Sequence, residues 1–164
     1  MALSSSDIIN TTGIRLPKDA CVVIVRTEWN AHIVDILEAG CIEVLKNHQV
    51  HYKLITVPGA FELVFGIKSY WDNHKYKDDK PHAFIALGCV LKGDTPHFEY
   101  VCNAATDGIL QLNLSLPIPT VFGVLTVNNQ DQADERTGGK HGNKGAESAA
   151  TALKMIALAE SFKK

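Results

Sequence analysis

A chain of 164 residues, of which 46% are hydrophobic, has the size of one ordinary domain and can bury a substantial core without disulfides. Its 16 basic and 18 acidic residues are interspersed and give a formal net charge of -2, which argues against a nucleic-acid surface or a polybasic membrane anchor. We predict a single domain over residues 1–164 that acts on small molecules, with no nucleic acid and no membrane among its partners.

The cysteines and the N-terminus bear on the compartment in which the protein works. No C-x-x-C pair occurs, and no histidine stands at zinc-finger spacing from a cysteine. The N-terminus lacks the basic and apolar regions of a signal peptide, and no apolar run approaches the roughly 20 residues of a membrane span. We expect reduced thiols, no metal site and a cytoplasmic location.

The chain begins with a polar segment, residues 1–18, which has little to pack and is predicted to be a flexible lead-in or an arm that attaches to a neighbouring subunit. Residues 21–25 (CVVIV) form an apolar run typical of a strand buried on both faces of a parallel sheet. The loop at 26–30 places Trp29 at the carboxyl end of that strand. Apolar residues recur at helical spacing through 31–48, which predicts a crossover helix.

A second strand is predicted over residues 52–57 and is ended by a Pro-Gly pair. A second helix is expected to open at residues 60–62 (AFE) and to run to about Trp71, which brings another loop to the carboxyl edge of the sheet. The charged segment 72–81 is interpreted as a surface loop without chemistry.

The central stretch begins with a third apolar strand, residues 83–87 (AFIAL), and two glycines bracket the exit from it. Thr95 is a favourable N-cap and Pro96 stands where proline is best tolerated, at a first helical position. A helix is therefore predicted to begin here and to run to about residue 115.

The start of that helix is a candidate anion site, because free amide groups and the helix dipole both favour negative charge. Thr95 can add a hydroxyl group and Lys92 a cation. His97 lies in the first turn, and its ordinary pKa of about 6.5 suits proton transfer near neutrality. A histidine taken alone is more often a solvated residue near a helix start, but the surrounding anion-site chemistry favours a catalytic role.

A fourth strand over residues 120–125 is expected to be interrupted early by its Phe-Gly pair. A short helix capped by an Asn-Asn pair follows and runs through Arg136. Residues 137–145 contain too many glycines to stay helical, and a final amphipathic helix begins at Ala146.

Strands that alternate with helices predict an α/β fold, a three-layer sandwich in which a four-stranded parallel sheet carries helices on both faces. Four loops then meet at the carboxyl edge, namely those at Trp29, at 60–62, at 90–97 and after Leu125. Because ligands of such sheets bind at that edge, we expect an active site there.

Several motifs remain open to more than one interpretation. Trp29 and Phe61 could cover the sheet edge or stack on a planar ring, and two aromatic residues at one edge favour stacking. Arg136 and Lys144 could be surface charges or anion ligands. The glycine-rich segment does not fit the P-loop spacing, and no G-x-G-x-x-G follows the first strand, so nucleotide binding lacks support.

Four segments in unbroken order resemble the 6,7-dimethyl-8-ribityllumazine synthase family. They are VPGAFE at 57–62, GCVLKGDTPHFEYV at 88–101, VFGVLT at 121–126 and GNKG at 142–145. The resemblance implies a flavodoxin-like fold and the penultimate step of riboflavin biosynthesis. In that step 5-amino-6-(D-ribitylamino)uracil condenses with 3,4-dihydroxy-2-butanone 4-phosphate, and no metal or organic cofactor takes part.

The resemblance also implies roles for individual residues. Trp29 would stack on the ring, and His97 would transfer protons. The other substrate-binding residues are Ala60, Phe61 and Glu62 for the ribityl chain and pyrimidine, backbone groups of Cys89, Val90 and Leu91 for the uracil edge, Asp94, Thr95 and Arg136 for the phosphate, and Phe122 and Lys144. Cys89 departs from the hydroxyl or small residue frequent in relatives, and a backbone contact tolerates that change.

The family's site lies between adjacent subunits of a homopentamer, and Phe122, Arg136 and Lys144 would reach the neighbour's substrate. Some members assemble pentamers into an icosahedral shell that can enclose riboflavin synthase. Two alternatives stay open, a flavin- or lumazine-binding protein without turnover and a shell-forming carrier. A binding protein has no use for His97, Thr95 and Arg136 together, so catalysis is favoured.

Overall fold

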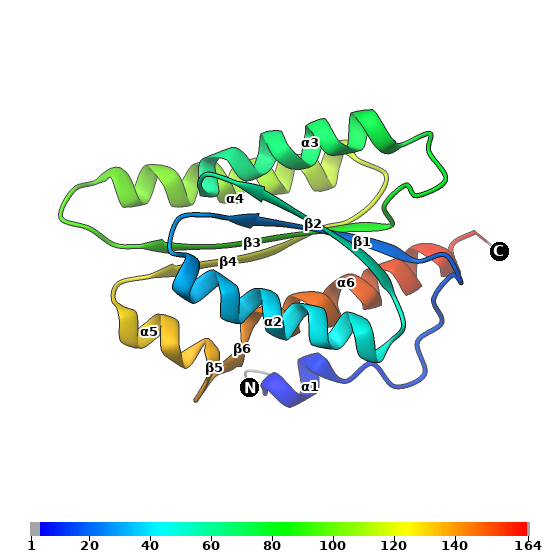
Figure 1. Cartoon of the computed structure of the whole chain (residues 1–164), viewed down its shortest axis with the longest axis horizontal. Helices are drawn as coiled ribbons and strands as arrows, with labels where there is room; N and C mark the ends of the chain where they lie inside the picture. Colours follow the sequence, from blue (N-terminus) through cyan, green and yellow to red (C-terminus); the bar gives the residue numbers. More distant parts are fainter. Residues whose placement is uncertain (1–3, 164) are drawn as a thin grey trace.

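Four parallel strands form the central sheet of the computed structural model, which describes residues 4–163 (Figure 1). The order is β2-β1-β3-β4. The strands are β1 (Cys21–Thr27), β2 (His51–Val57), β3 (Ala83–Leu91) and β4 (Thr120–Val127). The chain leaves β1 toward β2 on one side and returns to β3 on the other, which is the arrangement that opens a crevice at the carboxyl edge. The predicted four-stranded parallel sheet is confirmed.

Helices cover both faces of the sheet, as Figure 1 shows. α3 (Leu63–His74) and α4 (His97–Ser115) lie on one face, and α2 (Ala31–Asn47) and α6 (Lys144–Ser161) on the other. The strands serve both layers because successive side chains point to opposite faces. In β1, Val23 and Val25 pack under α3 and α4, while Val22 and Ile24 pack against α2 and α6. The three-layer sandwich is confirmed.

The fourth strand is longer than predicted, and its Phe-Gly pair does not interrupt it. Phe122 stands opposite Ala86 and Gly123 opposite Leu87 in the continuous ladder with β3. Gly123 is needed for packing, because a Cβ there would lie 2.8 Å from the hydroxyl oxygen of Ser148 on α6. The glycine therefore marks the close approach of α6 to the sheet.

The segment after β4 forms regular structure. α5 (Gln130–Glu135) is capped by the side chain of Asn129, which accepts from the amide of Gln132, as the Asn-Asn pair predicted. β5 (Thr137–Gly139) and β6 (Gly142–Asn143) then pair as a small antiparallel hairpin. α6 begins two residues before the predicted start, because the side chain of Asn143 caps it by accepting from the amide of Ala146.

The N-terminal segment differs from the flexible lead-in predicted for residues 1–18, of which 1–3 lie outside the described residues. α1 (Ser5–Ile9) begins in a capping box formed by Ser4 and Asp7. It packs on α6, where Lys154 Nζ donates to the carbonyl of Ile8 (2.5 Å) and Ser5 Oγ donates to Glu147 (2.8 Å). Hydrogen bonds to its own chain hold this segment, a pairing that its sequence alone does not reveal.

Two further comparisons with the sequence concern the surface. The charged loop predicted over 72–81 is shorter, because α3 continues to His74. No helix within residues 4–163 has the length and apolar character needed to cross a membrane.

Candidate active site

A cavity of about 470 Å³ lies at the carboxyl edge of the sheet, between the ends of β1, β2 and β3. Three of the four predicted loops line it, and the segment after Leu125 does not. The sequence-predicted residues that line it are Trp29, Ala60, Phe61, Glu62, Cys89, Val90, Leu91, Thr95 and His97. Asp94, Phe122, Arg136 and Lys144 do not. A volume of this size suits a small organic molecule.

Backbone hydrogen bonds hold Trp29 at the mouth of the cavity. The amide of Glu28 donates to the carbonyl of Val57 (2.9 Å), and the amide of Trp29 donates to that of Pro58 (3.0 Å). These bonds tie the loop after β1 to the loop after β2. The indole is 74% exposed, so its face is free to stack on a planar ligand.

Residues 60–62 form a 3₁₀ turn ahead of α3, where the sequence predicted the first turn of an α-helix. The amide of Glu62 donates to the carbonyl of Gly59 (3.2 Å), which is the tighter bond of that turn. Phe61 consequently points outward with 64% of its surface exposed. The carboxylate of Glu62 folds back toward Gly59, where an added Cβ would lie 3.1 Å from Oε2.

The end of β3 presents backbone groups to the cavity. β1 pairs with β3 only as far as Leu87, whereas β4 pairs with it through Leu91. The edge of residues 88–91 that faces β1 therefore has no strand partner within the described chain. Unpaired strand-edge groups can read the donors and acceptors of a planar ligand.

Asn30 is a lining residue that the sequence reasoning missed. Its Nδ2 donates to the carbonyl of Cys89 (2.8 Å), which joins the Trp29 loop to the end of β3. Its backbone is left-handed, with φ 57° and ψ 41°, a conformation that asparagine adopts more readily than most residues. An asparagine between a strand and a helix is a signal for that conformation, but its partner lies 59 residues away.

The Cys89 thiol is not poised to act as a nucleophile. Burial raises its pKa from 9.0 to about 11, so the thiol keeps its proton near neutrality. That Cys89 contributes backbone groups to a ligand stays a prediction.

α4 begins one residue later than predicted, and Thr95 is not its N-cap. Pro96 takes that place with φ -62° and ψ -7°, and no side chain caps the helix. The ring of Pro96 fixes a helical φ at the residue before α4. An N-cap residue is usually extended and caps through its side chain, and Pro96 does neither. The hydroxyl of Thr95 is left without a recorded partner in residues 4–163, and His97 lies exposed in the first turn beside it.

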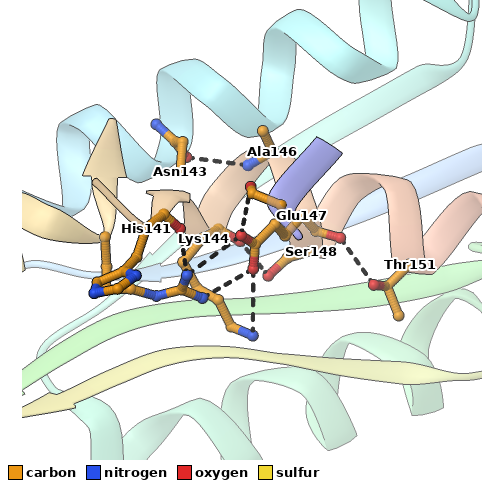
Figure 2. Close-up of polar contacts among 9 residues, drawn as sticks. His141, Asn143, Lys144, Ala146, Glu147, Ser148 and Thr151 are labelled. Atoms are coloured by element: carbon orange, nitrogen blue, oxygen red, sulfur yellow. Dashed lines mark hydrogen bonds and ion pairs between the residues drawn. The ribbon is translucent and has the colours of Figure 1, made fainter. Parts of the chain in front are cut away.

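Arg136 and Lys144 meet at a separate cluster around Glu147. Figure 2 shows Lys144 beside Glu147 at the start of α6. Nη2 of Arg136 lies 2.9 Å from Oε2 of Glu147, and Nζ of Lys144 lies 4.0 Å from the same oxygen. Arg136 ends α5 and Lys144 opens α6, with the β5–β6 hairpin between them. Residues 137–143 of the glycine-rich segment form an ordered hairpin between these two residues.

The fold and the cavity define a class, the α/β sandwich proteins that bind a small ligand at the carboxyl edge of a parallel sheet. Two exposed aromatic rings, a carboxylate, an open strand edge and an exposed histidine face one cavity. No three His, Cys, Asp or Glu side chains in residues 4–163 are grouped to hold a metal ion.

Comparison with known proteins identifies the family. Residues 19–160 match the family model described as 6,7-dimethyl-8-ribityllumazine synthase. Among curated relatives of that name, the Bacteroides fragilis protein is 46% identical over 86% of this chain and 97% of its own length. The Phocaeicola vulgatus protein is 47% identical over 86% and 83%, and the Flavobacterium psychrophilum protein 42% identical over 98% and 85%. The chain belongs to the 6,7-dimethyl-8-ribityllumazine synthase family, and the resemblance inferred from its motifs is confirmed.

Proposed function

We propose that this enzyme condenses 5-amino-6-(D-ribitylamino)uracil with 3,4-dihydroxy-2-butanone 4-phosphate to give 6,7-dimethyl-8-ribityllumazine, phosphate and water, the penultimate step of riboflavin biosynthesis. The observation that carries the proposal is the cavity where Trp29, Phe61 and His97 meet at the carboxyl edge of the sheet. Family membership supplies the reaction, and the cavity offers groups suited to a planar, polar substrate.

The aminouracil is proposed to bind by stacking and by its edge. Trp29 and Phe61 supply exposed aromatic faces at the mouth. Asn30 already donates to the carbonyl of Cys89, so the remaining backbone groups of Cys89, Val90 and Leu91 read the uracil donors and acceptors. Ala60 and Glu62 lie at the other wall, where a carboxylate can accept hydrogen bonds from the ribityl hydroxyls.

The butanone phosphate is proposed to bind at the start of α4. Asp94 and Thr95 precede the helix, whose first amide groups have no helical partner, and a helix of 19 residues carries a full dipole. Asp94 acts there through its backbone, because its carboxylate would repel the ester. Arg136, Lys144 and Phe122, which lie outside this cavity, are proposed to come from the adjacent subunit.

His97 is proposed to carry protons between the successive steps. The ketone and the 5-amino group form an imine with loss of water, and phosphate leaves with its C–O bonding pair to give an enol. The enol becomes a ketone, and the ribitylamino nitrogen attacks it to close the ring with loss of a second water. Each step moves a proton near His97, and holding both substrates together supplies much of the acceleration.

The assembly and the compartment are part of the same proposal. We infer a homopentamer with sites between subunits, and the partly exposed Arg136 and Lys144 support it, because neither side chain lines the sheet-edge cavity of its own chain. A larger shell, with riboflavin synthase as a partner, extends it. Residues 1–164 are proposed to form one domain, since both core clusters share the same sheet. Four free cysteines favour the cytoplasm.

The test mixes purified protein with both substrates and no added metal, and follows lumazine absorbance against the uncatalysed reaction. Clear acceleration is expected. Tight lumazine or flavin binding without acceleration would contradict the proposal and establish the binding-protein alternative. Light scattering on the same sample separates a pentamer from a shell.

A further inference from the structure

Glu147 is a buried carboxylate that the proposed chemistry does not use. Its side chain is only 4% exposed, and it is the one ionisable residue among the buried polar residues of the described chain. A charge so placed is costly unless hydrogen bonds and opposite charges compensate it. Glu147 lies beside Arg136, which is proposed to bind the phosphate ester. We therefore ask what this buried carboxylate does for Arg136.

The groups around Glu147 come from three separate elements. Figure 2 draws the contacts of its carboxylate as dashed lines. Ser5 Oγ of α1 donates to Oε1 (2.8 Å), and Arg136, at the end of α5, donates through Nη2 to Oε2 (2.9 Å) and through Nη1 to Oε1 (3.4 Å). Lys144, on α6 itself, adds a second cation. Arg136 and Lys144 carry two positive charges and Glu147 one negative charge, so the cluster has a net charge of about +1. The cluster can therefore still attract an anion.

The backbone under Glu147 is rigid. Asn143 caps the helix, Ser148 Oγ donates to the carbonyl of Lys144 (2.7 Å), and Thr151 Oγ1 donates to that of Glu147 (2.8 Å). A Cβ at Gly145 would overlap the carbonyl oxygen of Leu37, so this turn lies directly against α2. The carboxylate is therefore a fixed support for whatever binds it.

The pairing leaves one edge of the Arg136 guanidinium open. Nη1 donates to the carbonyl of His141 and to Glu147, and Nη2 donates once to Glu147. The remaining N–H groups, on Nε and Nη2, lie on one edge of the planar group. Within residues 4–163 Nε donates to no acceptor and is not a fully buried atom, and the side chain is 29% exposed. Two parallel N–H groups match a phosphate bidentately.

We propose that Glu147 is a positioning residue, which holds the Arg136 guanidinium so that its Nε–Nη2 edge is presented to the phosphate ester of the substrate bound by the adjacent subunit. This role rests on the proposed function. Without the carboxylate, the carbonyl of His141 would be the remaining acceptor described for the guanidinium, and its Nε–Nη2 edge would have to be ordered each time an ester binds.

The test is a kinetic comparison of the Glu147→Gln enzyme with the unmodified one. The amide keeps the shape but replaces one acceptor by a donor that opposes Nη2. We expect the KM for the butanone phosphate to rise about tenfold, as for one weakened charge-assisted contact. The KM for the aminouracil and kcat should change less than about threefold, because the carboxylate touches no reacting atom.

Two further variants separate positioning from stability and charge. Glu160→Gln, on the same helix but in an exposed pair with Lys163, is the matched control and should leave both KM values unchanged. Glu147→Asp keeps the charge but shortens its reach, so a smaller rise in the KM for the ester is expected. If circular dichroism shows that Glu147→Gln does not fold, the KM values of Glu147→Asp are used instead to test the positioning role.

The outcomes are distinct. An unchanged or lowered KM for the ester in a folded Glu147 variant, with an active unmodified enzyme, would overturn the positioning role and leave the proposed function standing. Equal rises in both KM values would point to a merely structural residue and also overturn it. Failure of the unmodified protein to form lumazine would overturn the proposed function and this role together.

Discussion

Arg26 and Arg136 each bind a glutamate, but they present their guanidinium groups in opposite ways. Nη1 of Arg26 donates to both Asp35 (2.6 Å) and Glu38 (2.5 Å), while its Nε is buried and has no partner among residues 4–163. Arg136 binds Glu147 through two nitrogens and keeps an open edge. The side chains are 13% and 29% exposed. An arginine enclosed by its own chain supports the fold, whereas one held with a free edge can also serve a ligand.

The surroundings of Arg26 explain its structural character. Burial by itself lowers the pKa of Arg26, but hydrogen bonds to Glu38 and Asp35 outweigh burial and leave the pKa above its ordinary value. Arg26 stands at the end of β1 and both carboxylates on α2, so the pair fixes the helix that follows the Trp29 loop.

Removing Arg26 should have the largest effect of the changes that test this comparison. Arg26→Ala leaves Glu38 poorly solvated without its cation, and we expect the free energy of unfolding in urea to fall by about 3 kcal/mol. Asp35→Asn, which alters only the exposed partner, should cost less than about 1 kcal/mol. Equal losses in the two variants would show that Arg26 is no more structural than a surface pair.

Removing His97 should slow the chemistry without abolishing it. We expect kcat of His97→Ala to fall about 10²-fold, at the lower end for a general acid–base group, because substrate positioning survives. The free energy of unfolding of this variant should differ by less than about 1 kcal/mol from that of the unmodified protein, since the imidazole is exposed. Unchanged turnover across the neutral pH range would exclude the proton-transfer role.

Replacing Arg136 by lysine should come next in size. Arg136→Lys keeps the charge but loses the planar fork, so the KM for the butanone phosphate should rise about tenfold, or about 1.4 kcal/mol. Arg15→Lys, at an exposed arginine of the N-terminal segment, serves as the matched exchange and should not show that rise. A variant with an unchanged KM would place the phosphate elsewhere.

The smallest expected effect concerns Cys41, which is buried near Glu38. Its burial should lower the free energy of unfolding at high pH. Burial, and then the charge of Glu38, raise the pKa of Cys41 from 9.0 to about 12. The folded state therefore keeps a proton that the unfolded state loses, so stability is full below pH 9 and falls as the pH rises toward 12.

By pH 10 the contribution of Cys41 to this loss is about 1 kcal/mol. Urea unfolding at pH 8 and pH 10 measures it, and Cys41→Ala should show a smaller drop between the two. The same drop in both proteins would assign the alkaline loss to other groups.

The strands, the crossover helices and most of the cavity could be predicted because they depend on local patterns. Apolar runs mark buried strands, and the parallel order brings their carboxyl ends together. Trp29, Phe61 and His97 therefore fell at one edge without knowledge of any contact. Family resemblance added their roles, and these roles stay predictions.

The features that could not be predicted depend on partners far along the chain. The bond from Asn30 to Cys89 and that from Ser5 to Glu147 span 59 and 142 residues. Gly123 was interpreted as a strand breaker because glycine has weak strand propensity, and the crossing of α6 that requires it is invisible to local reasoning. Arg136 and Lys144 were predicted as ligands, but the carboxylate between them was not.

Gly145 allows α6 to pack directly against the backbone of α2. The first turn of α6, which carries Lys144 and Glu147, lies against the backbone of Leu37 on α2. α2 follows Trp29 and carries the two carboxylates that bind Arg26. A single methyl group at position 145 would act as a wedge between the two helices. Because Trp29 precedes one of these helices and Lys144 opens the other, such a displacement would move the mouth of the cavity and the cations around Glu147 together.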